Sequence, residues 1–258
     1  MDRKARHVAT RLACVAASLG ITVACSVPRE RATGLPAQAL TVQVATEAGA
    51  LPVILHLAAG AGPHPTVVWF HGFPGLPEPV PEAAAQLRDA GLNVLYVHYS
   101  GSWGTPGSFS LAQVRTDAAT TLARVRAAPA AWRVDPAHII VGGDSFGSWV
   151  ALQTAAADPA VSCVATALVF DLGRLGRDLA ASDDMRAGFG GMFQQVDEDP
   201  TLGYALQGGS EGLMSAIIED APRNDLVSSA PRLRGRSVLL VGAAAWLAIL
   251  LLRSLGFG

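Results

Sequence analysis

The chain has 258 residues, half of them hydrophobic and 16% charged, which is enough for one sizeable core and short for two ordinary enzyme domains. Its formal net charge of -2, without a basic run interleaved with aromatic residues beyond the N-terminus, excludes nucleic acid as an expected partner. The 27 glycines and 16 prolines lie at predicted turns and not in low-complexity tracts, so we expect one globular, loop-rich domain.

Residues 1–25 have the pattern of a secretory signal peptide. A basic stretch precedes the apolar run 12–24, which is shorter than the roughly 20 residues that a membrane-spanning helix needs. Small residues stand before Cys25, and this resembles a bacterial lipoprotein cleavage box, in which Cys25 would carry a lipid that holds the protein at the membrane. The alternative is plain cleavage with release. In both cases we expect an exported protein, either a cell-envelope lipoprotein or a secreted or periplasmic protein.

Residues 26–40 are polar, rich in Arg, Pro and Ala, and without periodicity, which predicts a linker between the export signal and the fold. Residues 41–47 alternate between apolar and polar, and residues 50–57 are mostly aliphatic. We therefore expect an antiparallel hairpin at one edge of a sheet.

Short, nearly continuous apolar runs follow, as is typical of parallel strands covered on both faces. These strands are expected at residues 66–70, 93–99, 138–142, 161–170 and 237–241. Helices are expected between them at residues 81–90, at residues 111–125 and from the residue after Ser145 to about residue 157. Strands that alternate with helices predict an α/β fold with a mostly parallel, doubly wound sheet.

Residues 173–236 interrupt this alternation with two short predicted helices in a Gly-rich setting, one of them at residues 211–219. We expect a small cap insertion over the carboxyl edge of the sheet, where it would cover a substrate pocket.

The strongest local signal is the pattern G-x-S-x-G formed by Gly143, Ser145 and Gly147 between a predicted strand and a predicted helix. In such a turn the serine hydroxyl projects above the sheet, and the glycines are needed because strand and helix pass too closely for side chains. The backbone N–H of Phe146 would point at a developing oxyanion. The pattern also arises by chance in Gly-rich chains, but its position between a strand and a helix predicts that Ser145 is a nucleophile.

A second loop supports this interpretation. His71 and Gly72 directly follow a predicted strand, and a glycine there lets the backbone N–H of Phe73 turn toward the same oxyanion. An ordinary tight turn is the alternative for this loop.

Several segments together resemble the bacterial α/β-hydrolases grouped with dienelactone hydrolases and prolyl-oligopeptidase-like serine esterases. They are HGFPG (71–75), YVHYSGSWG (96–104), PGSFS (106–110) and GDSFG (143–147), and the resemblance covers residues 41–242. Such relatives often carry Arg at the position of Ser100 and His at the position of Asp144. The resemblance implies an α/β-hydrolase fold and hydrolysis of a small carboxylic ester, or less readily an amide, through an acyl-Ser145 intermediate, without a metal or a cofactor.

In this fold an acid and a histidine follow the nucleophile in chain order. None of the six histidines follows Ser145, and no carboxylate follows Asp225. The segment 237–242 resembles the strand that leads to the acid, but residues 243–258 form an apolar tail that is atypical of the family. We therefore expect the last strand and helix to be missing, a sheet that exposes an apolar edge, and a weak hydrolase.

Three explanations of this tail remain open. The chain could be a truncated or out-of-frame version of a complete enzyme, or residues 238–252 could form a membrane helix, although this run is short for a span. In the third, the site is rearranged, with His71 or His98 as the base and Asp171 as the group that orients it. The rival to the enzyme hypothesis is a non-catalytic remnant that at most binds a small ligand. The oligomeric state is not predicted.

Overall fold

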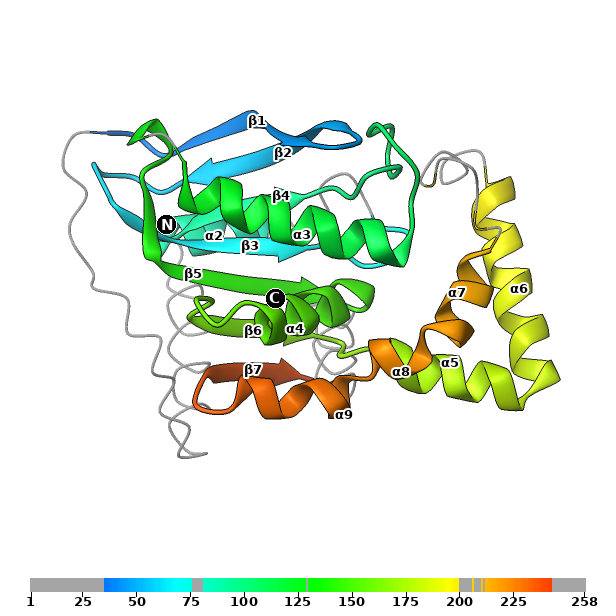
Figure 1. The fold of residues 1–258 in the computed structure, drawn as a ribbon. Helices are drawn as coiled ribbons and strands as arrows, with labels where there is room; N and C mark the ends of the chain where they lie inside the picture. The colour runs from blue at the N-terminus through cyan, green and yellow to red at the C-terminus, as the bar shows by residue number, and fades with distance from the viewer. Residues whose placement is uncertain are drawn as a thin grey trace, which may run out of the picture.

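The computed structural model describes residues 35–75, 81–128, 130–199, 206, 210 and 212–242. Its centre is a seven-stranded sheet with the strand order β1-β2-β4-β3-β5-β6-β7 (Figure 1). β2 pairs antiparallel with β1 and with β4, whereas the neighbours from β4 through β3, β5 and β6 to β7 pair parallel. The strands are β1 (Gln38–Thr46), β2 (Gly49–Leu57), β3 (His64–Phe70), β4 (Asn93–Val97), β5 (Val134–Asp144), β6 (Cys163–Ala167) and β7 (Ser237–Val241).

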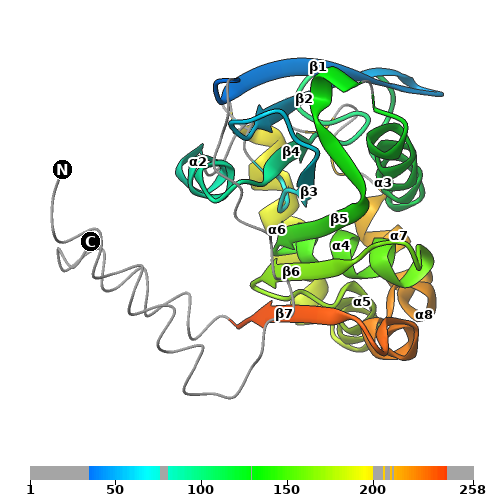
Figure 2. The same cartoon turned by 90° about the vertical axis from the view of Figure 1, so that its left-hand side faces the viewer.

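Helices lie on both faces of this sheet. Figure 2 shows α2 on one face and α3 and α4 on the other. Figure 1 shows α5, α6 and α7 beyond the carboxyl ends of the strands. The helices are α2 (Pro81–Asp89), α3 (Leu111–Arg126), η1 (Ala130–Trp132), α4 (Phe146–Ala157), α5 (Leu172–Ala181), α6 (Asp183–Glu198), α7 (Leu213–Glu219), α8 (Ala221–Asn224), α9 (Leu226–Ser229) and η2 (Ala230–Leu233). The predicted doubly wound α/β architecture is confirmed.

The antiparallel hairpin begins earlier than expected. β1 starts at Gln38, because Gln38 to Leu40 pair with Leu57 to Leu55 of β2. The predicted linker 26–40 is therefore wrong at its C-terminal end. Its first nine residues, 26–34, lie outside the described part of the chain.

The core lies between the sheet and the helices that cover it. The apolar positions of α3 that recur at helical spacing are all buried, at 1–2% exposure, and face the sheet. Along the central strands Val68, Phe70 and Val141 are fully buried. The nearly continuous apolar runs therefore mark strands covered on both faces, as their pattern predicts.

The insertion after β6 differs from the expectation of two short helices. α5 and α6 are longer than expected, and α6 spans 16 residues although it contains Gly188, Gly190 and Gly191. The Ser182 side chain caps α6 by accepting a hydrogen bond from the backbone N–H of Met185. Two acidic residues in the first turn also stabilise the helix through their interaction with the positive end of its dipole. Of the predicted helix at residues 211–219, the structure describes α7 at Leu213–Glu219.

The last part of this insertion does not belong to the cap. The indole Nε1 of Trp149 in α4 donates to the carbonyl oxygen of Asn224 in α8 at 3.0 Å. Arg236, which precedes β7, donates to the carbonyl oxygens of Ala155 and Asp158 at the end of α4. Residues 226–236 therefore extend the helix layer beside α4, whereas α8 also packs on α5 and lies with α5, α6 and α7 beyond the strand ends (Figure 1). The predicted cap boundary at residue 236 is wrong for this reason.

The outer strand β7 is only partly covered by the described residues. Val238, Leu239 and Leu240 are 38%, 45% and 55% exposed, and their side chains alternate between the two faces of the sheet. An exposed apolar edge was expected from the sequence, and β7 has one within the described part of the chain.

No helix among the described residues is long and apolar enough to cross a membrane. The expected signal peptide 1–25 with Cys25, and the apolar tail 243–258, lie outside the described residues.

Candidate active site

Ser145 lies in a sharp turn between β5 and α4. Its φ of 50° and ψ of -119° are unusual for a residue with a side chain. The turn is held by the Ser145 backbone N–H, which donates to the carbonyl oxygen of Ala167 at 3.0 Å, and by the Ser145 carbonyl oxygen, which accepts the N–H of Ser148 at 2.9 Å. Although Ser145 occupies the N-cap position, its hydroxyl makes no capping bond to α4. The half-buried side chain is therefore not used to start the helix.

The two glycines of the turn are required by close backbone contacts. A Cβ at Gly143 would lie 2.2 Å from the carbonyl oxygen of Gly147, and a Cβ at Gly147 would lie 2.0 Å from that of Phe70. Both distances are far inside van der Waals contact. The spacing in G-x-S-x-G thus has the steric cause that the sequence predicted.

Phe146 is the first residue of α4, so its backbone N–H is among those that have no partner within the helix. Its ring is buried and contacts the rings of Tyr99 and Trp149, with centroids 5.8 and 5.4 Å away. These contacts fix the first turn of α4 and so the direction of its N-terminus. The structure therefore provides a helix N-terminus next to Ser145, as an oxyanion site requires.

The loop after β3 approaches the same turn. A Cβ at Gly72 would lie 3.4 Å from Cβ of Ser145 and 2.9 Å from Oδ2 of Asp144, so Gly72 packs directly against the Ser145 turn. The ring of Phe73 meets that of Phe146 at 6.5 Å in an edge-to-face arrangement. The structure thus brings Gly72, Phe73, Ser145 and Phe146 together, although the oxyanion role of the two N–H groups stays a prediction.

His71 is the first residue of this loop, and its side chain points into the interior. Its side chain is 1% exposed, and its Nδ1 lies 2.6 Å from the carbonyl oxygen of Gly72. The hydroxyl of Tyr99 donates to the carbonyl oxygen of His71 at 2.9 Å. Burial lowers the pKa of His71 from 6.5 to about 3. A neutral imidazole with so low a pKa is a weak base, so these contacts favour a structural role for His71 in the loop.

His98 is buried at the carboxyl end of β4. Its ring lies 5.8 Å from the His71 ring and 5.6 Å from the Tyr96 ring. The structure therefore places the two candidate histidines side by side.

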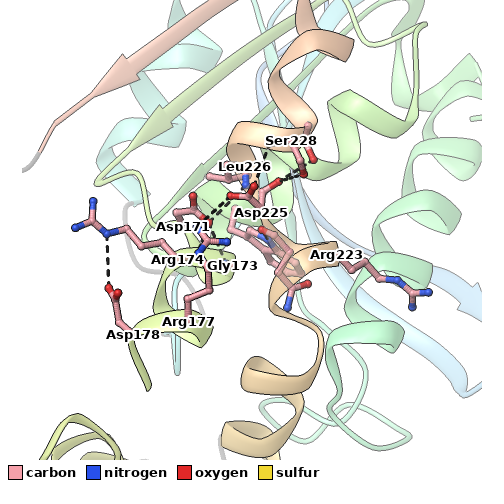
Figure 3. Close-up of polar contacts among 12 residues, drawn as sticks. Asp171, Gly173, Arg174, Arg177, Asp178, Arg223, Asp225, Leu226 and Ser228 are labelled. Atoms are coloured by element: carbon pink, nitrogen blue, oxygen red, sulfur yellow. Dashed lines mark hydrogen bonds and ion pairs between the residues drawn. The ribbon is translucent and has the colours of Figure 1, made fainter. Parts of the chain in front are cut away.

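Asp171 caps α5. Its Oδ1 accepts the backbone N–H groups of Gly173 and Arg174 at 2.9 and 3.1 Å, and that of Leu226 in α9 at 3.5 Å (Figure 3). Three N–H donors thus converge on this one oxygen, and the carboxylate ties the start of α5 to α9. These contacts favour a structural role for Asp171 at the start of α5, and its role in orienting a histidine stays a prediction.

Two polar contacts around the site were missed by reasoning from the sequence. The indole Nε1 of Trp69 donates to Oδ1 of Asp144 at 3.1 Å, and burial raises the pKa of that carboxyl. The fully buried carboxylate of Asp117 accepts the N–H and hydroxyl of Ser100 at 2.7 and 3.0 Å. Asp117 stands beside the apolar stripe of α3, and a carboxylate at a buried helix position was the feature of the sequence from which this contact could have been predicted.

Aromatic side chains join the site to the cap. Phe193 of α6 lies 5.5 Å from Phe73 in an edge-to-face arrangement, and Phe109 lies 6.2 Å from Phe73 and 6.0 Å from Phe146. The cap helix therefore contacts the proposed oxyanion loop directly. These aromatic rings form an apolar wall next to Ser145.

The described residues contain no group of three or more His, Cys, Asp or Glu side chains that could hold a metal ion. Cys163 is buried in β6 as a free thiol.

Comparison with known proteins finds similar solved structures. A hypothetical protein from Pseudomonas aeruginosa is 16% identical with a TM-score of 0.57, and the match covers 83% of this chain and 82% of that one. A hyperthermophilic esterase from the archaeon Pyrobaculum calidifontis is 17% identical with a TM-score of 0.50, and the match covers 81% of this chain and 76% of that one. The chain has the α/β-hydrolase fold. Puromycin hydrolase has the same fold over 79% of this chain, with 20% identity and a TM-score of 0.54.

This chain spans 30% of the length of puromycin hydrolase. No protein-family model matches the sequence, and no curated protein matches it either. At these identities the similarity to solved α/β-hydrolases concerns the fold, and the chemistry has to be argued from the site.

Proposed function

We propose that this α/β-hydrolase chain is an exported serine hydrolase that acts on small carboxylic esters, and less readily on amides. The observation that carries the proposal is the conformation of Ser145. It has a φ of 50°, its hydroxyl is not used to cap α4, and both glycines of its turn are sterically required. This is the geometry in which a serine hydroxyl projects from the sheet toward a substrate.

In the proposed reaction the Ser145 Oγ attacks the ester carbonyl carbon. The π-electron pair moves to the carbonyl oxygen, where the N–H groups of Phe73 and Phe146 stabilise the negative charge. Collapse of this adduct breaks the bond to the alkoxy oxygen, which takes up the proton that Ser145 Oγ released on attack and leaves as an alcohol. Water then hydrolyses the acyl-Ser145 ester and releases the carboxylic acid.

The proposed rate is low, because the serine needs a base. With a pKa of about 3, His71 has little tendency to accept its proton, and none of the six histidines follows Ser145 in the sequence. An enzyme without a triad member keeps only the acceleration that binding and the oxyanion hole provide. The same observation favours a second candidate, a non-catalytic α/β-hydrolase fold that binds a small ligand at the site.

A fluorophosphonate probe separates the two candidates. We expect the folded full-length chain to become covalently labelled, because Ser145 attacks the phosphorus and displaces fluoride. Labelling should disappear in Ser145→Ala and persist in Ser108→Ala, which removes an exposed hydroxyl elsewhere. A folded chain that takes up no label over hours would favour the non-catalytic candidate.

Hydrolysis of 4-nitrophenyl butyrate by the same variants measures turnover, and His98→Asn tests the remaining candidate base. A reduction of at least tenfold in kcat with an unchanged KM would support His98 as the base. An unchanged kcat would remove it.

Export is proposed on the sequence pattern of residues 1–25, in which Cys25 is the lipid acceptor. Mass spectrometry of the N-terminus from the cell producing the protein tests this. An unprocessed Met1 would contradict export, and a free N-terminus after residue 24 or 25 without lipid would contradict the lipoprotein form.

A further inference from the structure

A groove of about 580 Å³ lies in the helix layer between α3 and α4 on one side and α8, α9 and η2 on the other. Its volume is within the range of small-molecule sites. Thr154, which lines it, is nine residues after Ser145 along the same chain segment. At 1.5 Å per residue this part of the groove is about 14 Å from the Ser145 turn, and none of the residues that line the groove belongs to the candidate active site.

The lining of the groove is positively charged. Three arginines line it, namely Arg115, Arg223 and Arg232, against a single carboxylate, Asp158. Three positive charges and one negative charge give +2, although the whole chain has a net charge of -2. Asp158 is also already paired, because Arg126 approaches it to 2.6 Å.

Arg115 is held in place within the groove wall. Its guanidinium stacks over the ring of Trp149 with 5.2 Å to the centroid, and it donates to Oδ1 of the fully buried Asn224. Its ion pair with Asp220 is long, with 4.0 Å between Nη1 of Arg115 and Oδ2 of Asp220. Burial lowers the pKa of Arg115, so its charged form lacks part of the solvation it would have in water. A ligand oxyanion would supply that missing solvation.

Arg223 and Arg232 are exposed on the opposite wall. Figure 3 shows the guanidinium of Arg223 pointing away from Asp171 and Asp225, the two carboxylates of the neighbouring helix junction. Within the described residues no ion pair joins either arginine to a carboxylate. Both guanidinium groups are therefore available to an anion in the groove.

The remaining lining is mixed. Ala119 of α3, together with Ala157, Pro159 and Pro222, contributes exposed hydrocarbon surface between the arginines, whereas Gln153, Thr154, Ser228 and Ser229 are polar. An apolar body with one oxyanion head matches this lining, because the body covers the hydrocarbon and the head meets the guanidinium groups.

We propose that this groove is a second binding site, for a small amphipathic ligand whose head is a carboxylate or a phosphate. The site is formed only where α8, α9 and η2 pack on α3 and α4, so an occupied groove holds these two parts of the helix layer together. Binding therefore stabilises the folded chain in proportion to ligand concentration.

Isothermal titration calorimetry of the full-length chain at constant ionic strength tests the site with octanoate, octyl phosphate, inorganic phosphate and the uncharged octyl glucoside. We expect octanoate or octyl phosphate to bind with a Kd below about 1 mM, and the uncharged probe to bind at least tenfold more weakly. The two charged probes distinguish a carboxylate from a phosphate head, and inorganic phosphate shows whether the head suffices.

The decisive variant is the double substitution Arg223→Gln with Arg232→Gln, which should weaken binding at least tenfold. Its control, Arg174→Gln with Arg234→Gln, removes the same two charges from exposed positions outside the groove and should bind as the unmodified chain does. Binding should also survive in Ser145→Ala. The proposal is overturned if neither charged probe binds, if both double variants lose affinity equally, or if Ser145→Ala abolishes binding.

Discussion

The centre of the sheet and its β7 edge are built from the same kinds of residues but differ in cover. In β3, β4 and β5 the aliphatic side chains are enclosed by helices on both faces, and Val68, Leu95 and Val141 have no exposed surface. In β7, Leu240 is 55% exposed although its sequence context is just as apolar. Composition thus predicts that a segment is a strand, and the elements packed on it decide how much that strand contributes to stability.

This difference has a consequence for the candidate site. The Ser145 turn, the loop after β3 and α4 all rest on the enclosed centre, and β6 separates β5 from the less covered edge strand β7. We therefore expect substitutions at the centre to be far more damaging than substitutions in β7.

The largest effect is expected for Gly147→Ala, because the new Cβ would lie 2.0 Å from the carbonyl oxygen of Phe70 and neither backbone segment can move easily. The free energy of unfolding should fall by about 4 kcal/mol or more, as measured by urea denaturation. The matched control is Gly188→Ala in α6, where no atom lies within 4 Å of the new Cβ. It should be neutral or stabilising by about 1 kcal/mol, owing to helix propensity. Equal losses in both variants would contradict the steric explanation.

A pair of leucines tests the comparison directly. Leu95→Ala removes a fully buried side chain and should lower the free energy of unfolding by about 3 kcal/mol. Leu240→Ala removes a side chain that is 55% exposed and should cost less than about 1 kcal/mol. A loss at Leu240 as large as that at Leu95 would mean that β7 is covered in solution.

The smallest of the three effects concerns pH. Burial lowers the folded-state pKa of His71 to about 3, below its ordinary value of 6.5. Between these values the unfolded chain binds the proton and the folded chain does not, so stability is lost as the pH falls from 6.5 toward 3. The contribution of His71 should amount to about 2–3 kcal/mol between pH 6.5 and 4.5.

Urea denaturation across this pH range in the unmodified chain and in His71→Asn measures that contribution as a difference of slopes. His138→Gln is the control, because His138 is exposed, and it should keep the slope of the unmodified chain. An unchanged slope in His71→Asn would show that His71 is not buried as a neutral group.

Much of the architecture was predictable from the sequence where an element carries its own boundary signals. The strand Ser237–Val241 and the helix from Phe146 to Ala157 were predicted with the bounds they have. Each is a clear apolar run with polar or glycine residues beside it.

Elsewhere the boundaries depend on contacts that are remote in sequence. β5 begins at Val134, before the predicted residue 138, because Val134 pairs with His64 across the sheet. β6 ends at Ala167, before the predicted residue 170, because Leu168 takes a φ of 55°. Neither pairing nor backbone conformation is visible in local hydrophobicity.

The candidate site shows the same division. Ser145 and its glycines were found because their pattern is local, whereas the contact between Asp171 and the N–H of Leu226 depends on the position of α9. The Asp117 carboxylate and its Ser100 donors are likewise 17 residues apart.

The contact between Trp69 and Asp144 gives the site a built-in fluorophore. The indole donates to the residue immediately before Ser145, and its ring fills the space above Gly142, where a Cβ would lie 2.7 Å from Cε3. A rearrangement of the turn would change the polarity around this indole and shift its emission. The difference spectrum between the unmodified chain and Trp69→Phe therefore isolates an optical signal of the Ser145 turn that needs no substrate and no chemical label.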